Sequence, residues 1–327
     1  MTHLPDWPNA YPKTLATGVL KQYNQDFKVT EIPLAMPTAE ETDEHIWLYI
    51  EKNGANTAWI AKRLAELAQV KEMDVGYAGM KDRHSISRQW FSIYLPRVAA
   101  PDFSQLNDDE MVVITQTRSN KKIRRGDLLG NHFEIRLRNI QGDKSLIEAN
   151  LEQVKALGVP NYFGEQRFGH DGNNIESGRA MLAGEIRVKQ RNKKSIYLSA
   201  IRSLLFNEVL AARINQGLWG QVVEGDQLNE YNAVTGPLWG RGRSATTANA
   251  LAIEQAIIDK YATLADGLEH AGLKQERRAL VSTPEHLNWQ WETSDDEEHL
   301  LLSFALPAGQ YATSVLQELM DVIEVRN

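Results

Sequence analysis

The sequence predicts an α+β protein of two domains, one rich in strands and the other rich in helices. Its 327 residues are more than one ordinary hydrophobic core supports, and 42% of them are apolar, which is enough to bury two cores. Period-2 alternation of apolar side chains dominates the N-terminal half, whereas helical spacing dominates the middle of the chain. The strand pattern returns at residues 300–306.

The N-terminal half is expected to hold several strands and few helices. Residues 45–51 alternate apolar and polar side chains, the pattern of a half-buried strand. A turn at Asn53-Gly54 leads to a helix that Asn56 or Thr57 can cap. Further strands are expected, in order, at residues 89–95, 111–117 and 133–138.

The middle of the chain is expected to be helical. Residues 143–157 place apolar side chains on one helical face and stop before Gly158 and Pro160, the usual signals for the end of a helix. We expect a domain boundary there. The later elements are expected to be helices at 196–215 and 248–264, a glycine-rich loop at 235–242, a strand at 300–306 and a helix at 313–323.

Composition excludes several kinds of chemistry. The chain has no cysteine, so disulfides, thiolate zinc sites and cysteine nucleophiles are excluded. Its eight histidines are scattered singly, without the spacing of metal ligands, and we expect no metal site. The N-terminal residues lack the basic and apolar segments of a signal peptide, and no apolar run reaches the length of a membrane span. A cytoplasmic protein without membrane contact is expected.

Basic residues are segregated, although the formal net charge is −7. Seven of them lie between Arg118 and Arg138, against two acidic residues, and a second cluster runs from Arg187 to Arg202 without any acid. Segregated positive charge can bind a polyanion despite a negative total. Either cluster alone is as readily a solvated face, but two clusters around the same motif region favour RNA.

One short run, Gly76 to His84, carries the main candidate for catalysis. Asp82 lies between two cations, Lys81 and Arg83, close to Gly79. Neighbouring positive charge favours the ionised form of an aspartate, which can then act as a nucleophile or as a base. From these residues alone, a solvated turn is the alternative interpretation.

The same run resembles a family motif. Tyr77 to Arg83, continued by Gln89-Trp90-Phe91, resembles the aspartate motif of the TruD-type tRNA pseudouridine synthases, which isomerise uridine at position 13 of tRNA. The resemblance extends from about Gly18 to Glu318. Further matching motifs follow in order at residues 130–133, 159–164, 166–169, 191–194, 306–309 and 311–314.

The resemblance implies a fold and an activity. It implies a catalytic pseudouridine synthase domain, built on a largely antiparallel mixed sheet and formed by residues 1–157 and 304–327. A helix-rich TRUD-type domain would be inserted at residues 158–303. The implied function is isomerisation of uridine to pseudouridine in tRNA, with no cofactor and no obligate protein partner.

The resemblance also implies site residues. It assigns the catalytic role to Asp82 and leaves open whether Asp82 attacks C1′ of the ribose or removes the C2′ proton. A uridine in folded RNA must be flipped out, at a cost that base stacking on aromatic rings offsets. The implied substrate-binding residues are the aromatic side chains of Phe27, Phe133 and Tyr311 together with Asn131, Lys21 and Arg83. The candidates for RNA binding are Lys81, Arg124, Arg125, Arg167, Arg191, Lys193 and Lys194.

Alternatives remain for several of these residues. By their strand pattern, Phe133 and Phe27 are as readily core residues, and Asn131 is as readily a turn residue after Gly130. Residues 240–245 fit a dinucleotide-binding pattern, but they follow a turn instead of a strand, which argues against nucleotide-dependent oxidoreduction. The stronger rival function is a non-catalytic RNA-binding or RNA-folding protein, which has no need of Asp82.

Overall fold

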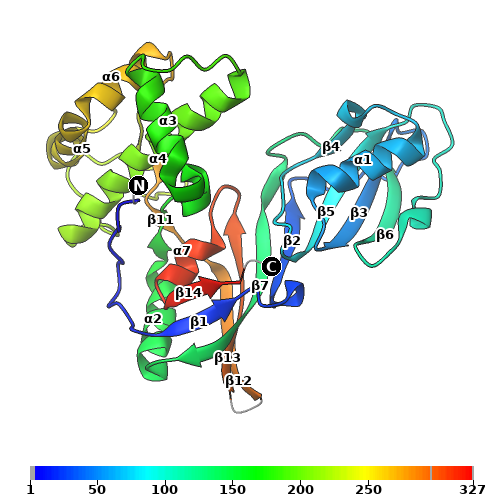
Figure 1. The fold of residues 1–327 in the computed structure, drawn as a ribbon, viewed down its shortest axis with the longest axis horizontal. Coiled ribbons are helices and arrows are strands. Elements are labelled where there is room, and N and C mark those ends of the chain that lie inside the picture. The colour runs from blue at the N-terminus through cyan, green and yellow to red at the C-terminus, as the bar shows by residue number, and fades with distance from the viewer. Residues whose placement is uncertain (1–3, 295–296, 326–327) are drawn as a thin grey trace. The chain divides into compact units, whose positions relative to one another are not determined.

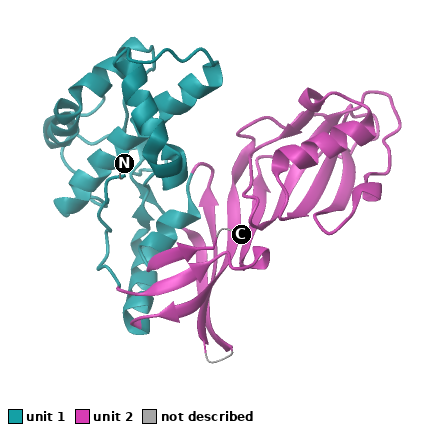
Figure 2. Cartoon of the chain, viewed as in Figure 1, with its two compact units in different colours: residues 1–14, 144–283, 310–319 teal, residues 15–143, 284–309, 320–327 magenta. Residues whose placement is uncertain are grey.

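The chain forms two compact units in the computed structural model, which describes residues 4–294 and 297–325. Unit 1 comprises residues 1–14, 144–283 and 310–319, and unit 2 comprises residues 15–143, 284–309 and 320–327 (Figure 2). Neither unit is one continuous segment of chain. Within the described ranges, no helix combines the length and the apolar character that crossing a membrane requires.

Unit 2 is built on a mixed sheet with the strand order β12-β13-β7-β2-β5-β3-β6, to which β1, β4 and β14 attach (Figure 1). The pairs β1–β14 and β2–β5 are parallel, and the other pairs of this sheet are antiparallel. The predicted α+β class with a largely antiparallel mixed sheet is confirmed. The strands of unit 2 are β1 (Thr17–Leu20), β2 (Phe27–Pro33), β3 (His45–Asn53), β4 (Val75–Tyr77), β5 (Ile86–Tyr94), β6 (Met111–Ser119), β7 (Leu128–Gln141), β12 (Glu285–Ser294), β13 (Glu297–Pro307) and β14 (Asp321–Glu324).

Helix α1 (Thr57–Ala68) packs its apolar side against this sheet and confirms the predicted helix. Ile60 and Leu64 are fully buried among residues of β3 and β5. The predicted cap is also confirmed, because the Asn56 side chain accepts a hydrogen bond from the Ala58 N–H at 2.9 Å.

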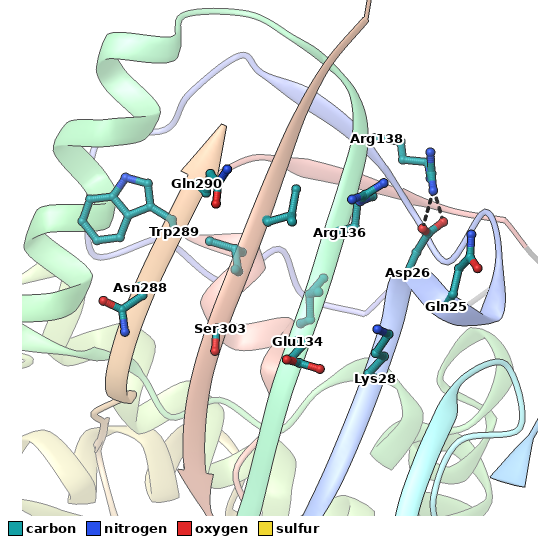
Figure 3. Close-up of a pocket in the computed structure, with 13 residues that line it drawn as sticks. Gln25, Asp26, Lys28, Glu134, Arg136, Arg138, Asn288, Trp289, Gln290 and Ser303 are labelled. Atoms are coloured by element: carbon teal, nitrogen blue, oxygen red, sulfur yellow. Dashed lines mark hydrogen bonds and ion pairs between the residues drawn. The ribbon is translucent and has the colours of Figure 1, made fainter. Parts of the chain in front are cut away.

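The side chains of strand β7 alternate between the two faces of the sheet in unit 2. Successive side chains of a strand point to opposite faces, so Phe133, Ile135 and Leu137 are buried on one face while Glu134 and Arg136 lie on the other. That other face carries a concave pocket of about 490 Å³ (Figure 3). Ion pairs between Arg136 and Glu292 and between Arg138 and Asp26 involve residues of its lining.

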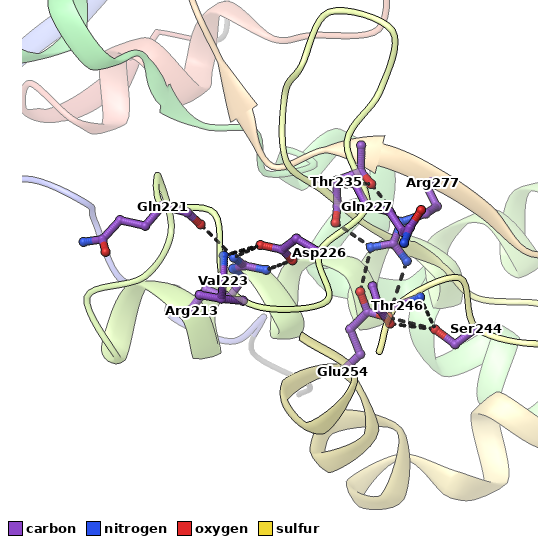
Figure 4. Close-up of polar contacts among 10 residues, drawn as sticks. All are labelled: Arg213, Gln221, Val223, Asp226, Gln227, Thr235, Ser244, Thr246, Glu254 and Arg277. Carbon is purple, nitrogen blue, oxygen red and sulfur yellow. Dashed lines mark hydrogen bonds and ion pairs between the residues drawn. The ribbon is translucent and has the colours of Figure 1, made fainter. Parts of the chain in front are cut away.

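Unit 1 is mostly helical, as predicted, and centres on the long, largely buried helix α4. Two ion pairs in its interior, Arg213–Asp226 and Arg277–Glu254, have N···O distances of 2.7 Å (Figure 4). Two small sheets complete the unit, pairing β9 with β10 and β8 with β11. Its elements are α2 (Lys144–Leu157), β8 (Val159–Pro160), α3 (Asn173–Leu182), α4 (Arg191–Asn215), β9 (Thr235–Leu238), α5 (Ala248–Lys260), α6 (Ala262–His270), β10 (Glu276–Ala279), β11 (Val281–Ser282) and α7 (Ala312–Gln317).

Three sequence predictions are wrong. The loop expected at 235–242 begins with strand β9, because it pairs with β10 about forty residues later. The helix expected at 248–264 is interrupted at Tyr261, whose φ of −115° is not helical. The helix expected at 313–323 ends at Gln317, and the chain continues into β14, which pairs with β1 from the other end of the chain.

The compact units do not follow the expected domain boundaries. The division after residue 143 places α2 with the helices, whereas the expected boundary followed residue 157. Strands β12 and β13 belong to unit 2, although most of their residues fall in the expected insertion at 158–303. The division into a catalytic and an inserted domain stays a prediction, and the ends of its catalytic segments, 1–3 and 326–327, lie outside the described residues.

Candidate active site

Asp82 lies in the irregular segment between β4 and β5, and its side chain is 41% exposed. Its Oδ2 accepts a hydrogen bond from Lys21 Nζ at 2.5 Å, and its Oδ1 accepts one from the His84 N–H at 3.2 Å. Both carboxylate oxygens are therefore held, and the carboxylate still faces solvent.

Lys21 links Asp82 to the C-terminal strand. It follows β1, is only 8% exposed, and donates a second hydrogen bond to Glu324 Oε1 in β14 at 2.6 Å. Its Nζ also lies 4.7 Å from the centroid of the Phe27 ring. Lys21 adopts a left-handed backbone conformation, with a φ of +57°, which is uncommon for a residue with a side chain. The surrounding contacts therefore fix an unusual conformation at this position.

These contacts favour the ionised form of Asp82. Burial by itself raises the pKa of its carboxyl, but the hydrogen bond and charge of Lys21, with the His84 N–H, outweigh it and hold the pKa below its ordinary value. Burial likewise lowers the pKa of Lys21, but the hydrogen bonds to Asp82 and Glu324 outweigh it and raise the pKa. The pair is charged on both sides at neutral pH.

The two cations next to Asp82 in the sequence do not contact its carboxylate. Lys81 Nζ instead pairs with Glu31 Oε2 at 2.9 Å, and the Lys81 side chain is only 5% exposed. Arg83 Nε donates to the carbonyl oxygen of Gly54 at 3.1 Å. The inference that Asp82 is held ionised by positive charge is correct, but the cation in contact is Lys21 in place of the sequence neighbours.

Strands β2 and β7 carry three of the predicted substrate-binding residues, Phe27, Asn131 and Phe133, on one face of the sheet. Glu31 and Asn131 are opposite each other in register, and Phe27 and Phe133 lie along the same face, with ring centroids 6.1 Å apart. Phe27 and Phe133 are each 7% exposed, so most of both rings is packed in the core. Asn131 Oδ1 is buried and has no hydrogen-bond partner in the described part of the chain.

The loop that carries Arg124 and Arg125 is joined to the Asp82 segment. The Gly126 N–H donates to the carbonyl oxygen of Ala78 at 2.9 Å. Arg125 covers the ring of Tyr77 at 4.4 Å and donates to its hydroxyl at 2.9 Å. Both arginines are exposed. Other members of this basic cluster have structural partners: Arg118 donates to backbone carbonyls, and Arg136 and Arg138 form ion pairs.

The remaining predicted residues belong to unit 1. Arg167 donates to the hydroxyl of Tyr311 and to Ser199 Oγ, both at 3.1 Å, so this hydroxyl already has a partner. Arg191, Lys193 and Lys194 lie in the first turn of α4 and are exposed.

Sequence reasoning missed Glu324, Glu31 and Lys52. Glu324 pairs with Lys21, Glu31 pairs with Lys81, and the fully buried Lys52 donates to the main chain of Asp82. Single charged residues within or after strands carry no sequence signal for such contacts. Glu31 and Lys52 differ from ordinary surface charges only in their burial, which sequence alone does not give.

The arrangement suits acid–base or nucleophilic chemistry on a polar substrate. An ionised, oriented and accessible carboxylate can remove a proton or attack an electrophilic carbon. The unpaired Asn131 oxygen can accept a hydrogen bond from a ligand. Among residues 4–294 and 297–325, no three histidine, aspartate or glutamate side chains gather as ligands for a metal ion.

Comparisons with known proteins identify the family. The family model described as tRNA pseudouridine synthase D (TruD) matches residues 12–189 and 229–319. The chain is 45% identical to tRNA pseudouridine synthase D of Aeromonas salmonicida, covering 94% of this chain and 92% of the relative. It is 42% identical to the protein of the same name from Xanthomonas campestris pv. campestris, covering 99% and 97%.

A solved structure shares the fold. The crystal structure of the putative tRNA pseudouridine synthase D from Methanosarcina mazei superposes with a TM-score of 0.75 at 21% identity, covering 98% of this chain and 96% of the other. Matches of this extent, at more than 40% identity to the two bacterial relatives, show that the chain belongs to the tRNA pseudouridine synthase D (TruD) family.

Proposed function

We propose that the protein isomerises uridine to pseudouridine at position 13 of tRNA and that Asp82 is its catalytic residue. The observation that carries the proposal is the ionised Asp82 carboxylate, held by Lys21 and the His84 N–H and 41% exposed. Membership of the TruD family supports the reaction class, and the names of the relatives support tRNA as the substrate. A tRNA substrate also favours the cytoplasm as the place of action.

The reaction breaks the glycosidic bond between C1′ and N1 and joins C1′ to C5 of the rotated uracil. C5 loses a proton and N1 gains one, so the isomerisation balances without an oxidant or a reductant. Asp82 acts either by attacking C1′ or by removing the C2′ proton, and both routes need its ionised form. The low pKa of Asp82 supplies that form at neutral pH.

We assign recognition of the flipped uracil to the face formed by β2 and β7. A buried acceptor without a partner costs free energy until a donor reaches it, and a uracil N–H is such a donor for Asn131 Oδ1. Phe27 and Phe133 expose only a small part of their rings, so they form an apolar wall of the site rather than an open stacking platform. Arg83 and Tyr311 remain proposed contributors to substrate binding.

We assign binding of the RNA backbone to cationic side chains. Arg124 and Arg125 are exposed on the loop bonded to the Asp82 segment, and Arg167, which is only partly exposed, is a further candidate in unit 1. Arg191, Lys193 and Lys194 place positive charge at the N-terminus of α4, where the helix dipole is also positive, and phosphate relieves both. Lys81 does not belong to these RNA-binding candidates, because its ammonium is buried in an ion pair with Glu31.

Pseudouridine mapping of unmodified tRNA transcripts tests the proposal. Wild type should form pseudouridine at position 13 without any added cofactor, and Asp82→Asn should be slower by roughly 10²–10⁴-fold with its tRNA affinity retained. Asp102→Asn, the same substitution at an exposed aspartate that caps a short 3-10 helix, is the matched control and should keep the wild-type rate. Conversion at another position would overturn the target, and tRNA binding without conversion by wild type would favour the non-catalytic RNA-binding alternative.

A further inference from the structure

Lys52 is an unusual residue for the interior of a sheet. It lies in β3, opposite Ser87 of β5 and Met111 of β6, and its relative exposure is 0%. Lysine is almost never fully buried unless it is paired. Among the described residues, however, no carboxylate is in ion-pair contact with Lys52; its Nζ donates to two main-chain carbonyl oxygens, those of Ala55 at 2.8 Å and Asp82 at 2.7 Å.

The buried ammonium is costly to the fold. Burial lowers the pKa of Lys52 to about 8, with the charge of Lys81 acting in the same direction and that of Asp82 opposing it. An apolar side chain of similar length would fill the same space without desolvating a charge. Core packing alone therefore does not account for a lysine at this position, and its two hydrogen bonds indicate another role.

One of these contacts fixes the main chain of the proposed catalytic residue. The carbonyl oxygen of Asp82 accepts hydrogen bonds from Lys52 Nζ and from the hydroxyl of Ser85 at 2.8 Å, and both donor residues are fully buried. The other Lys52 contact holds Ala55, in the turn between β3 and α1. The two segments are bonded further, since the Gly54 N–H donates to the carbonyl oxygen of Ser85 at 3.2 Å.

The segment around Asp82 needs such support because it belongs to no regular element. Residues 78–85 lie between β4 and β5 and have no ladder of strand hydrogen bonds. The carboxylate of Asp82 is held by Lys21 and His84 on the accessible side, and the carbonyl oxygen is held by Lys52 and Ser85 on the buried side.

We propose that Lys52 is a positioning residue for the isomerisation, which sets the orientation of the Asp82 carboxylate by holding the Asp82 carbonyl oxygen together with Ser85. This inference rests on the proposed function of Asp82. Lys52 touches neither the substrate nor the reacting atoms in this role. A misplacement of a reacting group by about 1 Å can cost about 10²-fold in rate, so loss of this support should act on the chemical step.

The test compares single-turnover rates and tRNA affinities of substituted proteins. Lys52→Met keeps the length of the side chain but removes its donors, and it should slow pseudouridine formation by roughly 10–10²-fold with tRNA affinity within about twofold of wild type. Ser85→Ala should have a smaller effect, because Lys52 still holds the carbonyl oxygen. The double variant should lose more than the product of the two single losses, since no side chain then holds that oxygen.

Leu48→Ala is the matched control. Leu48 is fully buried in the same strand, and its main-chain register partners are Phe91 and Gln116. The control loses core packing but should keep the wild-type rate at temperatures where it is folded. A wild-type rate for folded Lys52→Met, or an equal loss in Leu48→Ala, would overturn the proposal. If Lys52→Met does not fold, Ser85→Ala and the control supply the same comparison.

Amide hydrogen exchange separates failure of this proposal from failure of the proposed function. The amides of His84 and Ser85, which bond to Asp82 Oδ1 and to the carbonyl oxygen of Arg83, should exchange faster in Lys52→Met than in Leu48→Ala. This readout needs no activity. If wild type converts no transcript but exchange accelerates as expected, the proposed function fails and the support of Asp82 by Lys52 stands. Unchanged exchange refutes that support in either case.

Discussion

Glu318 should make the stability of unit 1 fall as pH rises from acid to neutral. The residue is 3% exposed, and its carboxylate accepts hydrogen bonds from the N–H groups of Ala10 and Tyr11 at 3.1 Å. Burial nevertheless raises its pKa from 4.5 to about 7, because the two hydrogen bonds only partly offset the loss of solvent. The difference between these two values corresponds to about 3 kcal/mol of unfolding free energy.

The direction follows from the protons bound by each state. Between pH 4.5 and about 7, the folded protein keeps the Glu318 proton that the unfolded chain has released, so the unfolding free energy falls as pH rises. Below this range both states are protonated, and above it both are ionised and the full cost of the buried charge is present. Glu318→Gln stays neutral throughout and can still accept one of the hydrogen bonds. Its stability relative to wild type should therefore increase by about 3 kcal/mol between pH 4 and pH 8.

Urea denaturation of wild type and Glu318→Gln at pH 4 and pH 8 measures this difference. Subtracting the unfolding free energy of wild type from that of Glu318→Gln at each pH cancels the contributions of all other titrating groups. Glu40→Gln, at an exposed glutamate, controls for the removal of one negative charge. A stability difference between Glu318→Gln and wild type that is the same at both pH values would refute the reasoning, because it would mean that residue 318 does not titrate differently in the two states.

Three further predictions concern ion pairs. Lys21→Met should slow single-turnover pseudouridine formation by about 10–10²-fold and shift the acid limb of its pH profile upward, because the pKa of Asp82 rises when the hydrogen bond and charge of Lys21 are removed. Glu324→Gln should change the same rate by less than about tenfold, since Glu324 binds Lys21, which in turn binds Asp82. Asp226→Asn should lower the unfolding free energy by about 3–5 kcal/mol in thermal unfolding, because the buried Arg213 keeps its hydrogen bond to the Gln221 carbonyl oxygen but loses the carboxylate that balances its charge (Figure 4).

The sequence predicted those helices and strands whose own residues show a regular alternation of apolar and polar side chains. The alternation at 45–51 became β3, and the helix after Asn53-Gly54 became α1 with Asn56 as its cap. Each of these elements is determined by side chains that are close in sequence, and the hydrophobic period records which of them face the core. The same holds for the helix that ends before Gly158.

Elements that depend on a distant partner were not predictable. Residues 321–323 fit the end of the helix expected at 313–323, but residues 321–324 form β14 because they pair in parallel with β1, about three hundred residues earlier in the chain. Strand β9 is a similar case, since its pairing with β10 outweighs the glycine and proline that indicate a loop. The residues of a strand do not show which strand edge elsewhere in the chain is available for pairing, so sequence patterns alone could not predict these two strands.

The candidate site shows the same division between local and distant information. The motif identified Asp82, but its ion-pair partner is Lys21 at the end of strand β1, which is far from it in sequence and also pairs with Glu324 of β14. Their position next to Asp82 in the sequence predicts Lys81 and Arg83 as its partners, yet Lys81 pairs with Glu31 and Arg83 donates to the carbonyl oxygen of Gly54. Adjacent side chains in an extended segment point in different directions, so proximity in sequence was a poor guide to contact.

The sharing of Lys21 between two carboxylates bears directly on what Asp82 can do. A one-to-one ion pair neutralises its carboxylate and weakens it as a base or nucleophile, whereas Lys21 divides its hydrogen bonds between Asp82 and Glu324. Lys21 thus keeps Asp82 ionised and oriented while it also binds Glu324. Attack at C1′ and removal of the C2′ proton both require an ionised, oriented carboxylate, and the parallel pairing of β14 with β1 brings Glu324 to the lysine that holds it.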